Sequence, residues 1–162
     1  MDEISFREAT TADAATVAAL VREAFREYEN RLDPPSSAHR DTPEAVLQRM
    51  AGSRVVLAFR KQEPIGCCFY EQKEDHLYFS RLSVAPGCRR RGIGGLLIAY
   101  VEARARQNNL FRVRLGVRLA LARLRAYYDR LGYRHLEYRK HEGYAEPTYV
   151  ILEKFLETTR HG

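Results

Sequence analysis

The spacing of apolar residues changes period several times along the chain and so predicts a mixture of helices and strands. Apolar side chains recur every three or four positions from Val17 to Tyr28, as on one face of a helix, whereas residues 53–84 form three alternating segments separated by polar turns. In order, the predicted elements are a strand at 3–9, a helix from 10–13 to about 30, a short helix at 42–50, strands at 53–60, 65–72 and 76–84, a helix at 92–107, a strand at 111–117, a helix at 119–131, and strands at 133–138 and 148–154. The pattern predicts one mixed α+β domain over residues 1–162, with an antiparallel meander in its first half.

The bulk composition is that of an ordinary globular domain. The 162 residues are 45% hydrophobic and 30% charged, and no apolar run approaches the ~20 residues that span a bilayer. The N-terminus lacks the basic start and apolar run of a secretory signal. The three cysteines, two of them adjacent at Cys67 and Cys68, do not suggest a disulfide framework. We therefore expect a cytoplasmic protein with no membrane contact.

The net charge of +6 raises the question of nucleic-acid binding. Acidic residues are interleaved with the basic ones, however, and the one dense basic cluster, Arg89 to Arg91, lies beside glycines, where a small phosphate-bearing ligand explains it equally well. Nucleic acid is therefore not expected as a partner. The five histidines show no metal-ligand spacing, so no metal is expected either.

The loop between the predicted strand at 76–84 and the predicted helix at 92–107 carries the clearest chemical signal. The first N–H groups of a helix lack partners within the helix, and Gly92, Gly94 and Gly95 let the backbone approach an anion closely. The same glycines also suit simple close packing of a helix start on a sheet, and on this pattern alone the two interpretations have equal weight. No Gly-Lys-Ser/Thr follows, and the preceding strand belongs to a meander, so nucleotide-binding folds are disfavoured.

Three motifs in this order resemble the GNAT family of N-acetyltransferases. Arg89-Arg90-Arg91-Gly92-Ile93-Gly94 matches the family's cofactor motif of Arg or Gln, two residues, Gly, one residue, and Gly or Ala. Residues 82–86 are similar to the family's strand ending, and residues 127–133 resemble its Tyr-x-x-x-Gly-Phe/Tyr helix ending. The resemblance implies a GNAT-type fold, with a central, mostly antiparallel sheet of about six or seven strands, flanked by about four helices and splayed between strands four and five.

The resemblance also implies acetyl-CoA as the acyl donor and assigns roles to residues. The backbone of Leu82, Ser83 and Val84 would pair with the pantetheine arm, and an N–H near Leu82 would polarise the thioester carbonyl. The pyrophosphate would be held by the loop and helix start, which comprise Arg89, Arg90, Arg91, Gly92, Ile93, Gly94 and Gly95. Tyr128 matches the tyrosine that protonates the departing thiolate and is the candidate catalytic residue. It also has the spacing of a core residue, while Tyr127 projects about 100° away and is less suited.

Two positions depart from the family pattern. Leu121 stands where many members have an Asn that contacts the cofactor, and residues 115–117 lack the carboxylate that some members use as a base. An amine arrives as an ammonium ion and must lose a proton before it attacks, so a base has to come from elsewhere. The candidates are Glu27, Glu29, Glu71, Tyr78 and Ser80, each of which is also explained as an ordinary surface or sheet residue.

The expected function is transfer of the acetyl group of acetyl-CoA to a primary amine, by direct attack in a ternary complex. The acceptor is a small-molecule amine or a peptide amine, and its specificity is expected to come from residues 28–42 and 138–148. These segments contain both acidic and basic residues, so their charge does not identify the acceptor. A non-catalytic module that binds CoA is the alternative, and a homodimer also stays open.

Overall fold

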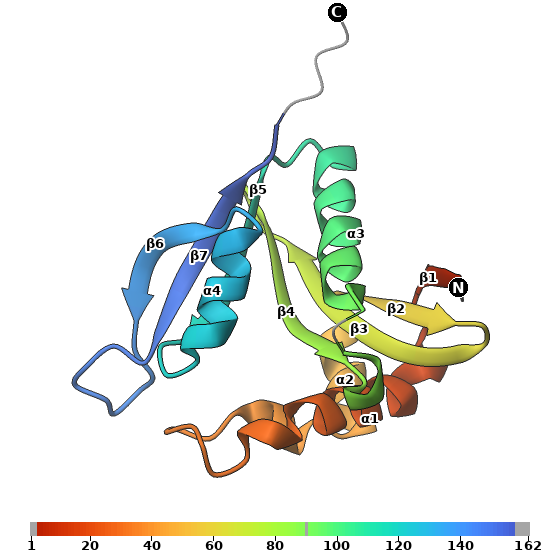
Figure 1. Cartoon of the computed structure of the whole chain (residues 1–162), viewed down its shortest axis with the longest axis horizontal. Helices are drawn as coiled ribbons and strands as arrows, with labels where there is room; N and C mark the ends of the chain where they lie inside the picture. The colour runs from red at the N-terminus through yellow and green to blue at the C-terminus, as the bar shows by residue number, and fades with distance from the viewer. Residues whose placement is uncertain (1–2, 90, 158–162) are drawn as a thin grey trace, which may run out of the picture.

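The computed structural model describes residues 3–89 and 91–157, which form the predicted succession of strands and helices (Figure 1). The strands are β1 (Ile4–Glu8), β2 (Arg54–Arg60), β3 (Glu63–Gln72), β4 (Leu77–Val84), β5 (Arg112–Arg118), β6 (Arg134–Arg139) and β7 (Tyr149–Phe155). The α-helices are α1 (Ala14–Phe25), α2 (Pro43–Met50), α3 (Ile93–Gln107) and α4 (Ala122–Arg130). Short 3-10 turns occupy Thr11–Asp13, Arg26–Tyr28, Ser37–Arg40 and Pro86–Cys88.

Two helix boundaries differ from the prediction. The first helix ends at Phe25 and tightens into a 3-10 turn, because the carbonyl of Ala24 accepts a hydrogen bond from Arg89 Nη2 at 2.7 Å. In a continuing α-helix that carbonyl would accept from Tyr28. The fourth helix begins at Ala122 and not at residue 119, because the backbone N–H of Leu119 donates to Thr148 at 3.1 Å and holds this segment against the start of β7.

The seven strands form one sheet in the order β1-β2-β3-β4-β5-β7-β6, and every neighbouring pair is antiparallel except β4 and β5. The parallel pair is joined only at Leu77 with Val113 and Tyr78 with Arg114. Beyond Tyr78 the two strands diverge, as Figure 1 shows. The mostly antiparallel, splayed sheet with four helices is confirmed. One edge of β4 is thus left without a strand beside it at the splay.

A β-bulge distorts β4 at the point where the strands diverge. Cys67 is opposite Ser83 and Phe69 is opposite Ser80, so β4 contains one more residue than β3 over this stretch. Arg81 lies inside the bulge with φ 54, a left-handed conformation that a non-glycine residue adopts only under local constraint. The bulge bends β4 away from regular pairing just before the loop that leads to α3.

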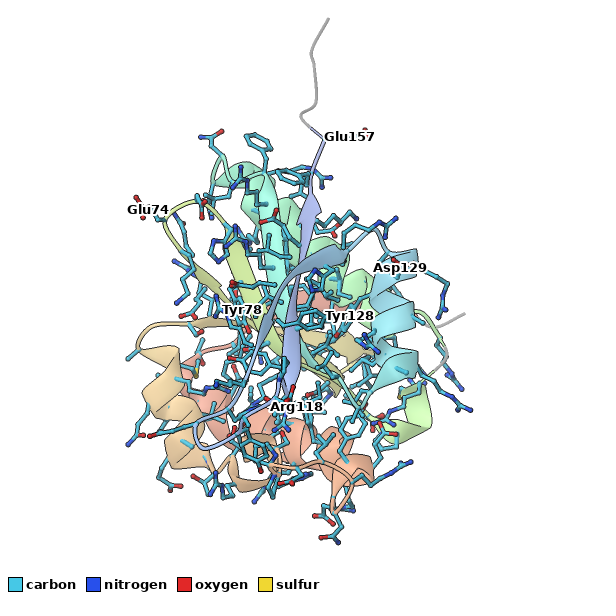
Figure 2. All side chains as sticks on the ribbon, turned by 90° about the vertical axis from the view of Figure 1, so that its left-hand side faces the viewer. Glu74, Tyr78, Arg118, Tyr128, Asp129 and Glu157 are labelled. Carbon is cyan, nitrogen blue, oxygen red and sulfur yellow. The ribbon has the colours of Figure 1, made fainter. Side chains whose placement is uncertain are left out.

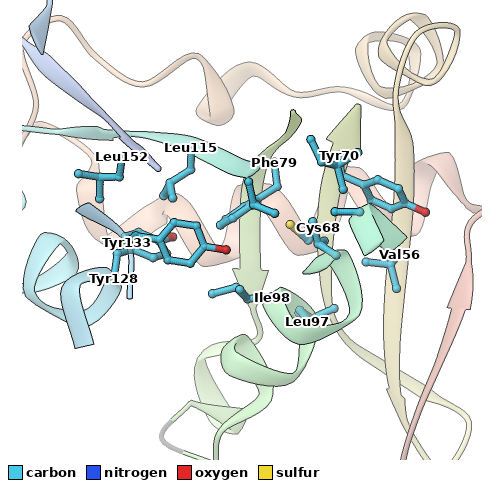
Figure 3. Packing of buried hydrophobic residues seen from close by; sticks show 14 of the residues in the cluster. Val56, Cys68, Tyr70, Phe79, Leu97, Ile98, Leu115, Tyr128, Tyr133 and Leu152 are labelled. Carbon is cyan, nitrogen blue, oxygen red and sulfur yellow. The ribbon is translucent and has the colours of Figure 1, made fainter. Parts of the chain in front are cut away.

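The helices cover both faces of the sheet, and the adjacent cysteines show the division. Cys67 packs in a cluster with α1 and α2, whereas Cys68 packs in a larger cluster with α3, Tyr128 and residues of β5 and β7. Figure 3 shows the second cluster, in which Tyr128 and Tyr133 lie together beside Phe79 of β4. Within the described ranges, no helix combines the length and apolar character needed to cross a membrane.

Candidate active site

A cavity of about 820 Å³ opens where β4 and β5 separate. Its walls come from the end of α1, most of β4, the start of α3, the end of β5, α4 and the β6–β7 loop. Figure 2 labels three of its lining residues, Tyr78 on β4, Arg118 on β5 and Tyr128 on α4. The predicted cofactor loop, the predicted catalytic tyrosine and both predicted acceptor segments therefore border one space.

The glycine loop forms one end of this cavity. Gly92 is the N-cap of α3 with φ 76, and a Cβ built there would meet no atom within 4 Å, so the backbone is open to the cavity. A Cβ on Gly94 would lie 3.2 Å from the Tyr127 hydroxyl, which is tight. Because the first N–H groups of the 15-residue helix α3 have no partners within the helix, this end fits a phosphate-bearing group.

The other predicted cofactor residues are divided between the cavity and its surroundings. Leu82, Val84, Arg89 and Ile93 line the cavity with Gly92 and Gly94. Ser83 is buried on the opposite side of β4 and donates its hydroxyl to the Arg81 carbonyl at 3.0 Å. Arg91 is exposed, Gly95 is half-buried, neither lines the cavity, and Arg90 lies outside the described residues.

Arg89 holds the loop against α1. Its Nη1 donates to Glu27 Oε1 and its Nη2 to the Ala24 carbonyl, both at 2.7 Å. The guanidinium therefore neutralises a carboxylate at the cavity wall and covers the C-terminal end of α1, where a positive charge is favourable. Its side chain thereby fixes the loop that carries Gly92, while its predicted part in cofactor binding stays a prediction.

Tyr128 combines burial with an unused hydroxyl. Its side chain is 4% exposed and packs against Phe79, Tyr127 and Tyr133, with ring centroids 5.5 to 6.2 Å apart. Among the described residues its hydroxyl has no hydrogen-bond partner, although the side chain lines the cavity. Burial raises the pKa of Tyr128 far above its ordinary value. The fully enclosed side-chain atoms without a partner in the described chain are His39 Nε2 and Arg125 Nε, so the Tyr128 hydroxyl is not one of them and is free to donate to a group that enters the cavity.

Two neighbouring tyrosines show what Tyr128 lacks. Tyr133 is 1% exposed, and its hydroxyl donates to Glu102 Oε2 at 2.8 Å. Tyr127 also lines the cavity and presents its hydroxyl to Gly94, although the helix spacing had placed it on a different face from Tyr128. Tyr127 is thus a second phenol of α4 at the cavity, and it lies between α4 and the glycine loop.

The acid and base candidates at the acceptor end are mostly engaged. Glu27 is paired with Arg89, and Glu71 with Lys73 at 2.9 Å. Tyr78 and Ser80 line the cavity, whereas Glu29 does not. Burial raises the pKa of Tyr78, so its phenol keeps its proton at neutral pH and cannot act as a base.

His141 is a functional candidate that the sequence did not single out. It lines the cavity from the β6–β7 loop, its Nδ1 contacts Thr148 Oγ1, and its ring lies 5.0 Å from that of Tyr149. Burial, followed by the charge of Arg118, lowers its pKa below the ordinary histidine value. The only advance signal was its position inside residues 138–148, because no local motif connects it to Thr148.

The two predicted acceptor segments lie side by side at the mouth of the cavity. The Tyr144 hydroxyl donates to Asp33, and Arg118 donates from Nη1 to the Pro34 carbonyl at 2.7 Å. These contacts join the β6–β7 loop and the end of β5 to the segment between α1 and α2. They bring together the two segments that the sequence predicted to bind the acceptor, and that role stays a prediction.

The sequence matches the acetyltransferase (GNAT) family over residues 17–133. This match covers most of the chain and contains the glycine loop, Tyr128 and the two strands that separate, β4 and β5. The chain belongs to the GNAT acetyltransferase family. A comparison with curated proteins finds no match.

Solved structures of the same fold support the assignment. The PaiA N-acetyltransferase from Thermoplasma acidophilum, solved with coenzyme A, aligns with a TM-score of 0.75 at 17% identity, covering 94% of this chain and 99% of that one. A GNAT acetyltransferase from Elizabethkingia anophelis with acetyl-CoA bound gives 0.69 at 20% identity, covering 96% and 100%. The ribosomal-protein-S18-alanine N-acetyltransferase from Escherichia coli gives 0.73 at 14% identity, covering 98% and 97%. At these identities the likeness concerns the fold.

Proposed function

We propose that the protein transfers the acetyl group of acetyl-CoA to a primary amine by direct attack within a ternary complex. The observation that carries the proposal is Tyr128, whose side chain is largely buried, whose hydroxyl has no hydrogen-bond partner among the described residues, and which lines a cavity that also contains the glycine loop. A fold neighbour solved with coenzyme A and another with acetyl-CoA support the choice of acyl donor.

The cofactor half of the cavity has the groups that a CoA thioester needs. When bound, acetyl-CoA supplies an activated acyl group on a thiol leaving group. The start of α3 at Gly92 and Ile93 offers backbone N–H groups to the pyrophosphate, helped by the positive end of the helix dipole. The edge of β4 beyond Tyr78 offers backbone groups to the pantetheine amides, because β5 does not pair with it there.

Tyr128 acts as a hydrogen-bond donor to the leaving sulfur. Its raised pKa keeps the hydroxyl protonated at every working pH, so the donor is always present. A donor held in place costs no reorganisation when negative charge develops on the sulfur, and this is the condition under which a single hydrogen bond lowers a barrier. Tyr127 is placed between the glycine loop and α4 and helps to orient the same arm.

His141 accepts the proton of the incoming ammonium ion. It is the one cavity-lining group of the described chain that is neutral at pH 7 and able to accept a proton without first leaving an ion pair. In the tautomer with its proton on Nδ1, that proton is donated to Thr148 Oγ1 and Nε2 carries the free lone pair. The lowered pKa matches a base that works near neutral pH.

Tyr128→Phe tests the proposal, with Tyr133→Phe as the matched control. Both changes remove one hydroxyl from the same aromatic cluster. Tyr128→Phe should lower kcat by ~10² or more with little change in melting temperature, because its hydroxyl has no partner in the described chain to lose. Tyr133→Phe should leave kcat within about threefold but destabilise the fold by about 1–3 kcal/mol, because Glu102 loses a buried donor.

The measurement is thiol release from acetyl-CoA over a panel of amines, followed by steady-state kinetics and thermal unfolding of both variants. If kcat of Tyr128→Phe stays within about threefold of wild type, Tyr128 is a packing residue and the mechanism is wrong. Binding of acetyl-CoA by calorimetry without turnover on any amine would instead indicate a CoA-binding module.

A further inference from the structure

One arginine at the acceptor end of the cavity has no acidic partner. Four arginines of the described chain line the cavity, and three of them pair with a carboxylate, namely Arg89 with Glu27 at 2.7 Å, and Arg81 and Arg49 with Asp41 at 3.0 and 3.8 Å. Arg118, at the end of β5, forms no ion pair with any residue in the ranges 3–89 and 91–157. Its positive charge is therefore available to a ligand.

Backbone carbonyls hold the Arg118 guanidinium in place without neutralising it. Nη1 donates to the Pro34 carbonyl at 2.7 Å and Nη2 to the Pro35 carbonyl at 3.4 Å, which uses two of the five N–H groups of the side chain. The other three form no hydrogen bond with a described residue. The nearest acid, Asp33, attracts Arg118 from beyond ion-pair distance, and its carboxylate accepts the Tyr144 hydroxyl. The Arg118 side chain is thus held in a fixed orientation, is charged, and has N–H groups left for a ligand.

We propose that Arg118 binds a carboxylate of the acceptor, so that the substrates are amines that also carry a carboxylate group. A half-buried guanidinium without a counter-charge is unfavourable, and a carboxylate matches its planar array of donors. This proposal rests on the proposed function, because the carboxylate that Arg118 would bind belongs to the same acceptor molecule whose amine is acetylated. His141 is close enough to feel the charge of Arg118, so the proton acceptor and the carboxylate receptor belong to one end of the cavity.

The competing explanation is that Arg118 only ties β5 to the Pro34–Pro35 segment. Such a role would affect all acceptors alike, because a displaced wall changes the cavity for every amine. A carboxylate receptor affects only acceptors that carry the carboxylate. Pairs of compounds that differ by that one group therefore separate the two explanations.

The experiment uses α- and ω-amino acids, each paired with its decarboxylated amine, such as L-phenylalanine with 2-phenylethylamine and 6-aminohexanoate with pentylamine. For the pairs that are acetylated, wild type should prefer the acid. Arg118→Gln should lower kcat/KM for the acid by ~10- to 100-fold, mainly through KM, and leave the matching amine within about threefold. Arg118→Lys should retain part of the preference, because it keeps the charge and loses the planar donors.

Arg112→Gln is the matched control. Arg112 lies at the other end of the same strand, is half-buried like Arg118, pairs with Asp75 at 3.4 Å and does not line the cavity. The same substitution there should leave both members of every pair unchanged. This control shows whether loss of any arginine from β5 is enough to alter the kinetics.

Calorimetric titration of the same compounds into the protein saturated with CoA gives a readout that does not depend on turnover. If no amine is acetylated but the acids bind and Arg118→Gln weakens them, the proposed function fails and the carboxylate receptor stands. The inference is overturned if wild type binds or uses the decarboxylated amine at least as well in every pair. Equal losses for both members in Arg118→Gln would overturn it too.

Discussion

The chemistry of the site depends on a few side chains whose partners are incomplete. Among the described residues, the Tyr128 hydroxyl has no hydrogen-bond acceptor and the Arg118 guanidinium has no acidic partner. In His141, Nδ1 contacts Thr148 Oγ1, and Nε2 forms no hydrogen bond with a described residue. Some polar groups of the core are matched, as Tyr133 is with Glu102 and Lys154 with the same carboxylate at 3.0 Å, whereas His39 Nε2 and Arg125 Nε, away from the cavity, are buried without a partner in the described chain. Unmatched polar groups around one cavity indicate that a ligand completes them.

His141 should control the acidic limb of the pH profile. Its pKa is lowered by burial and by Arg118, and the rings of Tyr144 and Tyr149 lie beside it. Protonated His141 cannot accept a proton, so wild-type kcat/KM should fall as pH drops through a value below the ordinary histidine pKa of about 6.5.

The test compares His141→Gln with His135→Gln. The first variant should lose ~10²-fold in kcat at pH 7 and lack the acidic limb that belongs to the histidine. His135 is exposed on β6 and does not line the cavity, so its variant should keep the wild-type profile. An unchanged acidic limb in His141→Gln would assign the base to another group.

At the scale of elements, the site is a strand that ends in a bulge, a loop that turns through a left-handed glycine, and a helix whose first turn faces the cavity. Gly92→Val should weaken acetyl-CoA binding by at least tenfold, because a side chain would stand where the backbone is open. The left-handed φ at Gly92 adds a folding cost of about 1–2 kcal/mol.

Gly143→Val is the control for the folding cost. Gly143 also has a positive φ, 87, and no atom within 4 Å of a Cβ, but it lies in the β6–β7 loop and does not line the cavity. Both variants should lose similar stability in thermal unfolding, and only Gly92→Val should lose acetyl-CoA affinity by calorimetry. Equal affinities in the two variants would contradict the assignment of the pyrophosphate to this loop.

The sequence predicted the elements and the glycine loop because their signals are local. Apolar spacing, Pro43 at the start of α2 and Gly132 with φ 98 after α4 each act within one turn of chain. The bulge at Arg81 was not predicted, since a non-glycine residue with positive φ leaves no mark in the sequence. The early end of α1 depends on Arg89, 65 residues away, and the placement of His141 and Arg118 depends on contacts between distant loops.

At the scale of the whole molecule, the splay divides the sheet into β1–β4 and β5–β7, which share only two paired positions. The core nevertheless crosses the divide. One cluster of buried residues contains Val56 of β2, Phe79 of β4, Leu97 of α3, Leu115 of β5 and Leu152 of β7. We therefore infer that the described residues fold as a single domain with one continuous core, and that the cavity lies where β4 and β5 separate.

Thermal unfolding with and without acetyl-CoA tests this view of the molecule. A core that crosses the splay predicts a single cooperative transition for the free protein, without a separate unfolding of β5–β7. Acetyl-CoA held at Gly92 and along β4, with its sulfur at Tyr128 as proposed, would contact both sides of the gap, so at 100 times its Kd it should add about 2.7 kcal/mol to the free energy of unfolding. For a protein of this size that corresponds to a rise in Tm of about 5–10 °C, with the transition still single. Arg118→Gln should show the same shift, because Arg118 is assigned to the acceptor and not to the cofactor. The free protein could instead show two transitions, with acetyl-CoA raising the Tm of only one of them. That result would show that the two halves of the sheet fold independently and that the ligand binds on one side of the splay.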